Sequence, residues 1–240
     1  MAAFVLVHGG GHGGWCYRKI TPLLRAAGHD VYAPTLTGLG ERKHLLRPDI
    51  DLDTHITDVV NLLECEDLEE VILLGHSYGG MVITGVADRA GSRIGHLVYL
   101  DAAHPKDGES LADITPEMMG LAHSDMRQVD GVELVLFPDS RAIPYLSVTD
   151  PVDFAWMKSK ITPHPWKCFT QKLWLGDEAA VRRIPRTNIN CTASLAMSSP
   201  EKRERQLDAE HLFEIDTGHD LMITEPRKVT DMLLQVAGKG

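Results

Sequence analysis

The sequence is poor in cysteine and in basic residues. Its four cysteines lie far apart, without the C-x-x-C spacing of zinc or redox motifs and without the pattern of a disulfide framework. Its 24 lysines and arginines are outnumbered by 34 aspartates and glutamates, which gives a formal net charge of −10. Binding to nucleic acid or to an anionic membrane requires clustered positive charge, so neither partner is expected.

Long apolar runs are also missing, and none could cross a bilayer as a helix. The first residues, MAAFVLV, lead straight into a strand-like segment, without the basic region or cleavage site of a signal peptide. At 240 residues, with 43% hydrophobic content, the chain can bury one core that carries an insertion. We therefore expect a cytoplasmic protein with reduced thiols and a single domain over residues 1–240.

Short apolar runs alternate along the chain with longer amphipathic stretches. This alternation predicts an α/β fold of about six mostly parallel strands with helices on both faces of the sheet. The expected strands are residues 4–7, 31–33, 71–74, 97–100, 188–191 and 212–215. The expected helices are residues 17–27, 54–65, 81–90 and 228–237.

The alternation stops between about residues 103 and 186. This segment contains several prolines, large apolar side chains and no clear strand. Because it is too long for a bare loop in a compact domain, it predicts an inserted helical lid. Its large side chains would form either the core of the lid or an apolar pocket wall suited to aromatic or medium-chain acyl groups. The candidates for that wall are Met119, Phe137, Trp156 and Trp166.

A serine between two glycines follows the apolar run at residues 71–74. Residues 75–80, GHSYGG, have the G-x-S-x-G pattern, and a helix-like stretch comes next. A strand, this pattern and a helix together predict a nucleophile elbow, in which a sharp turn exposes the Ser77 hydroxyl. A serine hydroxyl needs a neighbouring base to become a nucleophile. The best candidate base is His219, which follows Gly218 just beyond the expected strand at 212–215. The carboxyl ends of parallel strands share one edge, so Ser77 and His219 should meet there.

A glycine-rich loop, HGGGHGGW, occupies residues 8–15 directly after the first expected strand. It lacks the Gly-Lys-Ser/Thr ending of a phosphate-binding P-loop and the spacing of a dinucleotide fingerprint. A zinc pair of His8 and His12 is disfavoured because a glycine-rich loop does not align two rings as a helix would. We favour an oxyanion hole, in which the N–H groups of Gly10 and Tyr78 stabilise charge on a carbonyl oxygen. No metal or cofactor is expected.

Together these residues resemble the α/β-hydrolase fold and, within it, the salicylate-binding methylesterases, the hydroxynitrile lyases and their bacterial esterase relatives. The resemblance implies that Ser77 is the nucleophile, that His219 is the base and that Gly10 and Tyr78 form the oxyanion hole. It also implies that His12 lines the pocket. The matching stretches are residues 4–9, 12–15, 33–38, 75–81 and 218–220.

The sequence departs from this family in two ways. Hydroxynitrile lyases carry a threonine where this chain has Gly9 and a lysine where it has Leu221. Because no lysine is present to stabilise departing cyanide, no cyanohydrin cleavage is expected. The family also places an acid after the penultimate strand, where this chain has Ser194 and no carboxylate. A neutral serine cannot supply the charge that orients and stabilises the histidine.

Three explanations for the missing acid remain open. Asp101, at the end of the strand after the elbow, would lie on the same edge of the sheet, and we favour it. A carboxylate from a neighbouring loop, such as Asp216 or Glu201, could reach the histidine instead. In the third explanation no acid is present and activity is low or altered.

The sequence thus predicts a cofactor-free serine hydrolase that cleaves a small carboxylic ester, with an aryl, methyl or short to medium acyl group, through an acyl-enzyme. The alternatives are a lactonase, a carbon–carbon bond hydrolase or a decarboxylase of a specialised pathway, and a ligand-binding protein on a hydrolase scaffold. The expected partner is the small-molecule ester alone, and a homodimer is compatible with the sequence.

Overall fold

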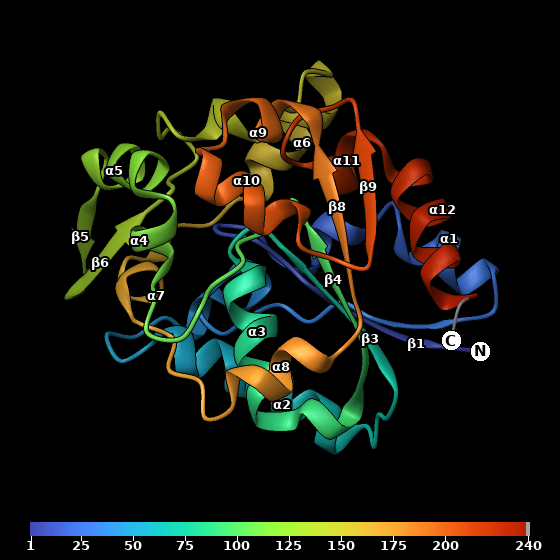
Figure 1. Ribbon diagram of the computed structural model, residues 1–240. Helices are drawn as coiled ribbons and strands as arrows, with labels where there is room; N and C mark the ends of the chain where they lie inside the picture. Colours follow the sequence, from blue (N-terminus) through green and yellow to red (C-terminus); the bar gives the residue numbers. More distant parts are fainter. Residues whose placement is uncertain (239–240) are drawn as a thin grey trace.

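The computed structural model describes residues 1–238 and has a parallel sheet of six strands at its centre, in the order β2-β1-β3-β4-β8-β9 (Figure 1). Every neighbouring pair in this sheet is parallel. The six strands predicted from the sequence are confirmed, with ends that differ by a few residues. They are β1 (Ala3–Val7), β2 (Asp30–Tyr32), β3 (Val71–His76), β4 (Ile94–Leu100), β8 (Arg186–Cys191) and β9 (His211–Ile215).

Burial explains the side-chain pattern of these strands. All six residues of β3 are buried, because the strand lies in the middle of the sheet with helices on both faces. In contrast, β9 forms one edge, and its side chains alternate between more and less exposed positions. Continuous apolar runs therefore mark the central strands of this sheet.

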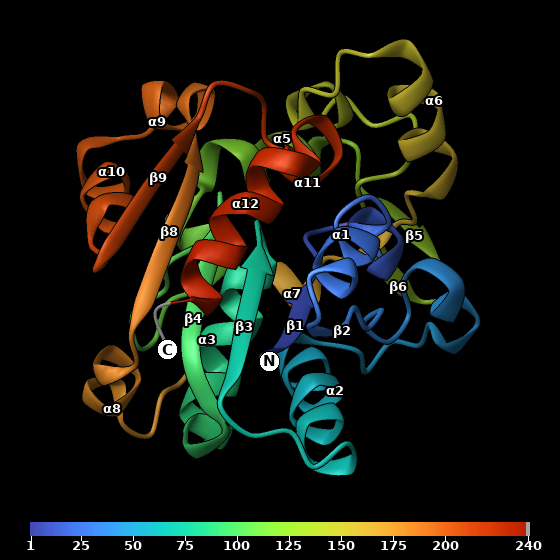
Figure 2. The same cartoon turned by 90° about the vertical axis from the view of Figure 1, so that its right-hand side faces the viewer.

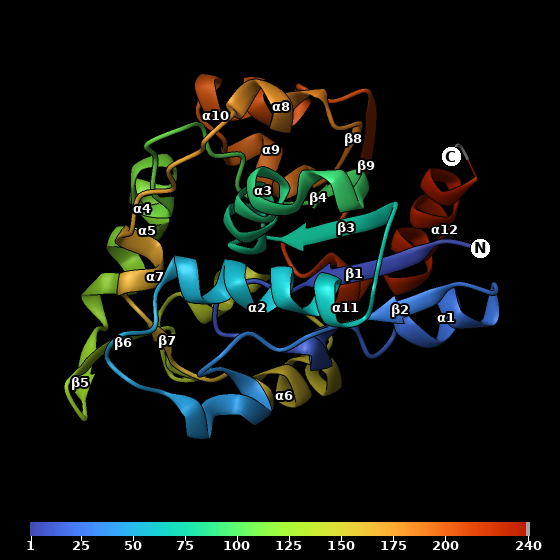
Figure 3. The same cartoon turned by 90° about the horizontal axis from the view of Figure 1, so that it is seen from below.

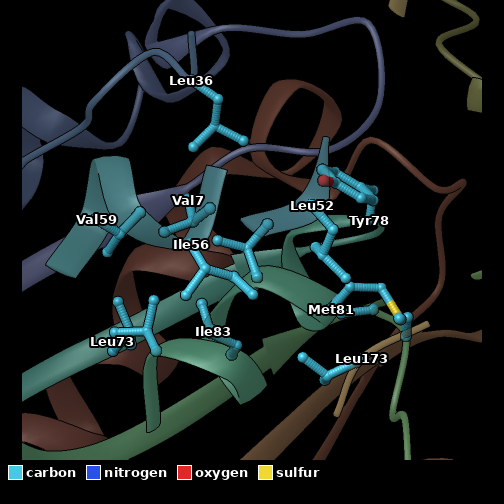
Figure 4. Close-up of a cluster of buried hydrophobic side chains, with 14 of the residues drawn as sticks. Val7, Leu36, Leu52, Ile56, Val59, Leu73, Tyr78, Met81, Ile83 and Leu173 are labelled. Carbon is cyan, nitrogen blue, oxygen red and sulfur yellow. The ribbon is translucent and has the colours of Figure 1, made fainter. Parts of the chain in front are cut away.

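Helices cover both faces of the sheet and divide the core into two clusters. On one face, α2 (Leu52–Cys65) and α3 (Gly79–Ala90) pack against β1 and β3 through side chains such as Ile56, Met81 and Leu73 (Figure 4). On the other face lie α1 (Thr21–Ala26), α11 (Leu221–Thr224) and α12 (Pro226–Ala237), whose apolar residues form the second cluster (Figure 2).

The helix expected over residues 17–27 is shorter than predicted. Residues Gly14–Tyr17 form a 3₁₀ turn, and the α-helix begins at Thr21, with Pro22 in its first turn. Proline is favoured there because its missing N–H has no partner in the first turn of a helix. The apolar pattern that predicted one helix over residues 17–27 therefore runs from the end of the 3₁₀ turn into the separate helix α1.

The segment between β4 and β8 contains several short helices and a small antiparallel sheet in the order β5-β6-β7. The expectation that it holds no clear strand was wrong. The strands are very short, but β5 and β6 are joined by Asp130-Gly131, both with positive φ, which is a strong two-residue hairpin signal. The elements are α4 (Leu111–Ile114), α5 (Pro116–Ser124), β5 (Arg127–Val129), β6 (Val132–Val135), α6 (Pro151–Lys160), β7 (His164–Pro165), α7 (Lys167–Thr170) and α8 (Glu178–Arg183).

Figure 3 shows α4, α5, α7, β5 and β6 gathered at one end of the central sheet, away from the amino terminus and α12. Two more helices, α9 (Thr192–Met197) and α10 (Pro200–Leu207), connect β8 to β9. Among residues 1–238, no helix is both long and apolar enough to cross a membrane.

The sharp turn from β3 into α3 depends on close backbone packing at Gly80. A Cβ at this position would collide with the carbonyl oxygen of Ala103. We expect Gly80→Ala to lower the free energy of unfolding by about 1 to 3 kcal/mol, since overpacking forces the backbone to shift. Gly120→Ala in α5 is the matched control, because nothing lies within 4 Å of its added methyl. Urea unfolding should show that the control is neutral or stabilised by up to about 1 kcal/mol.

Candidate active site

Ser77 lies at the turn between β3 and α3, where the sequence predicts the nucleophile elbow. Its φ of 54° falls in the left-handed region, which is rare for a residue with a side chain. A Cβ on Gly75 would lie 2.5 Å from the carbonyl oxygen of Gly79, so the turn can close only around glycine. Such strain persists only where the surrounding packing maintains it, and it is common at functional sites.

His219 lies beside Ser77, although 142 positions separate them in the sequence. It is in the loop after β9, and this loop returns from the edge of the sheet toward its middle, where α11 and α12 lie (Figure 2). His219 Nε2 is 2.8 Å from Ser77 Oγ, which is hydrogen-bonding distance. The structure therefore brings the predicted nucleophile and base together.

Asp101 is the carboxylate that contacts the other nitrogen of His219. It follows β4 directly, is 5% exposed, and its Oδ2 lies 2.6 Å from His219 Nδ1. Asp216 instead accepts a hydrogen bond from the Thr192 hydroxyl, and Glu201 accepts one from Arg205. Of the three carboxylates considered, the structure thus places Asp101 at the histidine.

Ser194 lies where the family has its usual acid, and it also contacts Asp101. Its hydroxyl donates to Asp101 Oδ2 at 2.6 Å, and the Cys191 N–H donates to Oδ1 at 3.2 Å. Burial alone would raise the pKa of Asp101, but the hydrogen bonds from His219, Ser194 and Cys191 outweigh it and lower the pKa to about 2. Asp101 therefore stays ionised at neutral pH despite its burial.

The backbone N–H groups of Gly10 and Tyr78 are the predicted oxyanion donors. Gly10 lies in the loop after β1, and Tyr78 follows Ser77 directly. Within residues 1–238, neither N–H donates a hydrogen bond to another protein group. Both N–H groups can therefore donate to a substrate oxygen, as an oxyanion hole requires before substrate binds.

Three histidines hold this glycine loop, and the sequence singled out none of them for that role. His8 Nδ1 lies 2.9 Å from the Gly9 carbonyl oxygen, and His12 Nδ1 lies 2.7 Å from that of Gly10. The Gly11 N–H donates to His164 Nδ1 at 3.2 Å. His164 lies more than 150 residues away in the sequence, so no local signal could have linked it to the loop.

His12, for which the resemblance implies a place in the pocket, is deeply buried. It is 1% exposed, it stacks on Trp15, and its Nε2 lies 3.1 Å from Asp220 Oδ2. Both ring nitrogens therefore have hydrogen-bond partners within the protein, and the ring supports the glycine loop through its contact with the Gly10 carbonyl.

Among residues 1–238, His55, His164 and Cys168 form a cluster of side chains that could hold a metal ion. All three are buried, and their ligand atoms lie within 4.8 Å of one another. However, His164 Nδ1 accepts the Gly11 N–H, so in the neutral ring Nε2 must carry the proton and has no lone pair for a metal. His55 also donates to the Thr37 carbonyl and accepts from the Tyr78 hydroxyl. The hydrogen bonding of this cluster fits a structural role.

The other predicted pocket residues lie in different surroundings. Met119 and Trp166 pack with the first core cluster, whereas Trp156 packs with the second and contacts Trp15 edge to face. Phe137 lies beneath the guanidinium of Arg127. The side chains that an added Cβ on Gly10 would meet are Leu136 and Phe169, which the sequence did not single out.

A cavity of about 310 Å³ lies next to Asp101 and is lined by residues that include Ala102, Ala103 and Arg205. Neither Ser77 nor Gly10 lines it. This cavity is therefore beside the candidate active site, between the end of β4 and α10.

The low pKa of Asp101 predicts a loss of stability in acid. The unfolded carboxyl has a pKa of 3.8 and the folded one about 2, so the stabilisation is complete above the unfolded pKa and is lost as pH falls through the folded pKa. This difference corresponds to about 2 kcal/mol between about pH 5 and pH 2. Urea unfolding at several pH values should show this acid-dependent fall in the free energy of unfolding in the wild type and not in Asp101→Asn. Asp216→Asn, which changes an exposed carboxylate, should follow the wild type; equal acid slopes in all three proteins would contradict the prediction.

Comparisons with known proteins show which sequences and folds this chain is similar to. The carbendazim hydrolyzing esterase of Nocardioides sp. (strain SG-4G) is 57% identical over 119 residues, which cover 50% of this chain and 49% of that protein. Salicylic acid-binding protein 2 of Nicotiana tabacum is 27% identical over 265 residues, which cover 98% of this chain and 97% of that protein. The crystal structure of the methylesterase MES16 from Arabidopsis superimposes with a TM-score of 0.76 at 25% identity and covers 100% of both chains.

The match to the first of these relatives spans about half of its length, whereas the other two match over nearly their whole length. The model of the alpha/beta hydrolase family matches residues 4–232, from the first strand of the sheet into the last helix. With this match and the parallel sheet that carries Ser77 at its elbow, the chain belongs to the alpha/beta hydrolase family.

Proposed function

We propose that the protein is a carboxylic ester hydrolase in which Ser77 is the nucleophile, His219 the base and Asp101 the acid that orients the histidine. The observation that carries the proposal is the pair of hydrogen-bonding distances at His219, 2.8 Å to Ser77 Oγ and 2.6 Å to Asp101 Oδ2. The names of its relatives, which include esterases and methylesterases, support the same chemistry.

In the first half of the reaction, Ser77 Oγ attacks the ester carbonyl carbon while His219 Nε2 accepts the hydroxyl proton. The tetrahedral intermediate then collapses as the C–O bond to the alcohol breaks. His219 returns its proton to the departing oxygen and an acyl-enzyme remains. In the second half, His219 takes a proton from water, hydroxide attacks the acyl carbon, and the proton returns to Ser77 as the carboxylic acid leaves.

Charge develops in two places during this cycle. The negative charge on the carbonyl oxygen is stabilised by the N–H groups of Gly10 and Tyr78, which need no reorganisation to reach it. The positive charge on His219 is stabilised by ionised Asp101, whose low pKa keeps it from taking the proton. Ser194 holds the Asp101 carboxylate through its hydroxyl.

The substrate is a small ester with an apolar acyl or aryl part. Leu136 and Phe169 lie against Gly10 and would contact the group next to the carbonyl. Because one relative is named for hydrolysis of carbendazim, carbendazim belongs in the substrate panel with methyl esters, aryl esters and lactones. Such a panel separates the esterase from a lactonase or another pathway enzyme.

The pocket roles of Met119, Phe137, Trp156 and Trp166, the action of the inserted segment as a lid, and assembly as a homodimer stay predictions. The cytoplasmic location with reduced thiols also stays a prediction. Within residues 1–238 all four cysteines are free.

Replacing the nucleophile provides the first test. We expect Ser77→Ala to abolish hydrolysis of p-nitrophenyl acetate and covalent labelling by a fluorophosphonate, because both reactions need the activated Oγ. Labelling is followed by intact-protein mass spectrometry, and thermal unfolding checks that the variant is folded. Labelling that survives in the variant would identify a different nucleophile. A folded wild type that is neither labelled nor active would favour a ligand-binding protein.

Replacing the acid tests the assignment of Asp101. Loss of the carboxylate with retained geometry can lower turnover by about 10⁴-fold, so we expect Asp101→Asn to lower kcat strongly with little change in KM. Asp216→Asn and Glu201→Gln are the controls, since these side chains contact Thr192 and Arg205 instead. Near wild-type turnover in Asp101→Asn, measured by steady-state kinetics, would show that another group orients His219.

A further inference from the structure

A second buried histidine–carboxylate pair lies behind the glycine loop. His12 and Asp220 are 1% and 0% exposed, and His12 Nε2 lies 3.1 Å from Asp220 Oδ2. The other nitrogen of this ring, Nδ1, lies 2.7 Å from the carbonyl oxygen of Gly10. Neither contact takes part in the reaction cycle described for Ser77 and His219.

These two contacts determine the protonation state of His12. A carbonyl oxygen and a carboxylate oxygen only accept hydrogen bonds, so each ring nitrogen must carry a proton for both bonds to form. Burial alone would raise the pKa of Asp220, but the charge of His12 and the hydrogen bond from it lower this pKa. With Asp220 ionised, both contacts of His12 form only if the ring is an imidazolium, because a neutral imidazole has a single N–H. Burial alone would lower the pKa of His12, but the charge of Asp220 and the hydrogen bond to it outweigh burial and raise it.

The pair joins the two loops that carry the candidate catalytic groups. On one side, the backbone N–H of His12 donates to the Gly9 carbonyl and its side chain donates to the Gly10 carbonyl, and these two carbonyls flank the Gly10 N–H along the backbone. On the other side, Asp220 follows His219 directly in the chain. His76 supports the same loop, because its Nε2 donates to the His219 carbonyl at 2.9 Å.

We propose that His12 and Asp220 form a buried imidazolium–carboxylate pair that fixes the Gly10 donor relative to His219, which makes both positioning residues for hydrolysis at Ser77. This inference rests on the proposed function. Neither residue contacts the reacting atoms. The pair acts through the Gly10 carbonyl, which belongs to the Gly10–Gly11 peptide. Holding this carbonyl restricts the backbone rotation of Gly10, whose N–H is the predicted donor.

The flexibility of the glycine loop and the charge on His12 both favour a positioning role for the pair. An oxyanion hole stabilises charge only if its donors already point to the developing oxyanion, and glycines by themselves leave the loop too free. Hydrogen bonds from a charged donor are stronger than neutral ones and fix the carbonyl more firmly. The neighbouring rings of His8 and His76 carry no competing charge, because burial lowers the pKa of each to about 3.

Two double variants test the contact to Gly10, each in an Asp220→Asn background that leaves no unpaired buried charge. His12→Asn places its amide near the position of Nδ1 and keeps a donor for the Gly10 carbonyl. His12→Gln places its amide near the position of Nε2 and loses that donor. The two double variants thus differ by one methylene group and by the hydrogen bond from residue 12 to the Gly10 carbonyl.

We expect the His12→Gln double variant to lose about 100-fold in kcat with KM nearly unchanged, the effect of misplacing a catalytic group by about 1 Å. The His12→Asn double variant should keep at least tenfold more activity than the Gln variant. Affinity for a boronic acid that mimics the tetrahedral intermediate should fall in parallel with kcat, whereas a merely structural role would change the melting temperature alone. Equal kcat in folded wild type and both double variants would overturn the proposal.

The wild-type protein allows a test that does not depend on how the variants fold. In protein with ¹⁵N-labelled histidine, His12 should show two protonated ring nitrogens at pH 7, and these signals should be absent from Asp220→Asn or from either double variant. A neutral His12 ring with one bare nitrogen would overturn the ion pair. Ser77→Ala separates this outcome from failure of the proposed function: if it hydrolyses esters as well as the wild type, then the function assigned to Ser77 is wrong, whatever the state of His12.

Discussion

The pair of hydrogen bonds at His219 is the contact on which the candidate active site depends. Its three members come from loops that follow β3, β4 and β9, and these loops meet because the strands are parallel and end at one edge of the sheet. The loop after β9 must travel furthest, since this strand lies at the outer edge. Asp220, which follows His219 and bonds His12, anchors this loop beside the glycine loop after β1.

Two residues with strained backbone angles lie at the same place. Ser77 and Asp101 both have positive φ values, 54° and 43°, at the ends of two adjacent strands. Each is held by the packing around it: the Ser77 carbonyl accepts from Gly80 and Ala103, and the Asp101 N–H donates to Ile189. The central strands and the apolar layers on both faces thus provide the rigid support that two strained turns require.

Asp101 and Ser194 together explain how the site can lack an acid after β8. The carboxylate comes from the neighbouring strand β4, and the serine in the usual place donates a hydrogen bond to it. The motif GHSYGG and the position of His219 beyond a strand were enough to predict two members of the site. For the third member the sequence favoured Asp101, after β4, but left Asp216 and Glu201 open, because only the fold determines which carboxylate faces the imidazole.

The sequence by itself determined the elements whose signals are local: six apolar runs for the sheet, the glycines of the elbow and the glycine loop after β1. These features depend on side chains only a few residues apart, so periodicity and turn chemistry reveal them. Tertiary structure alone decided which side chains meet across long distances, such as Asp101 with His219, His12 with Asp220 and His164 with Gly11. The physical reason is that each of these contacts links loops from different strands, and its geometry depends on the order, register and twist of the whole sheet.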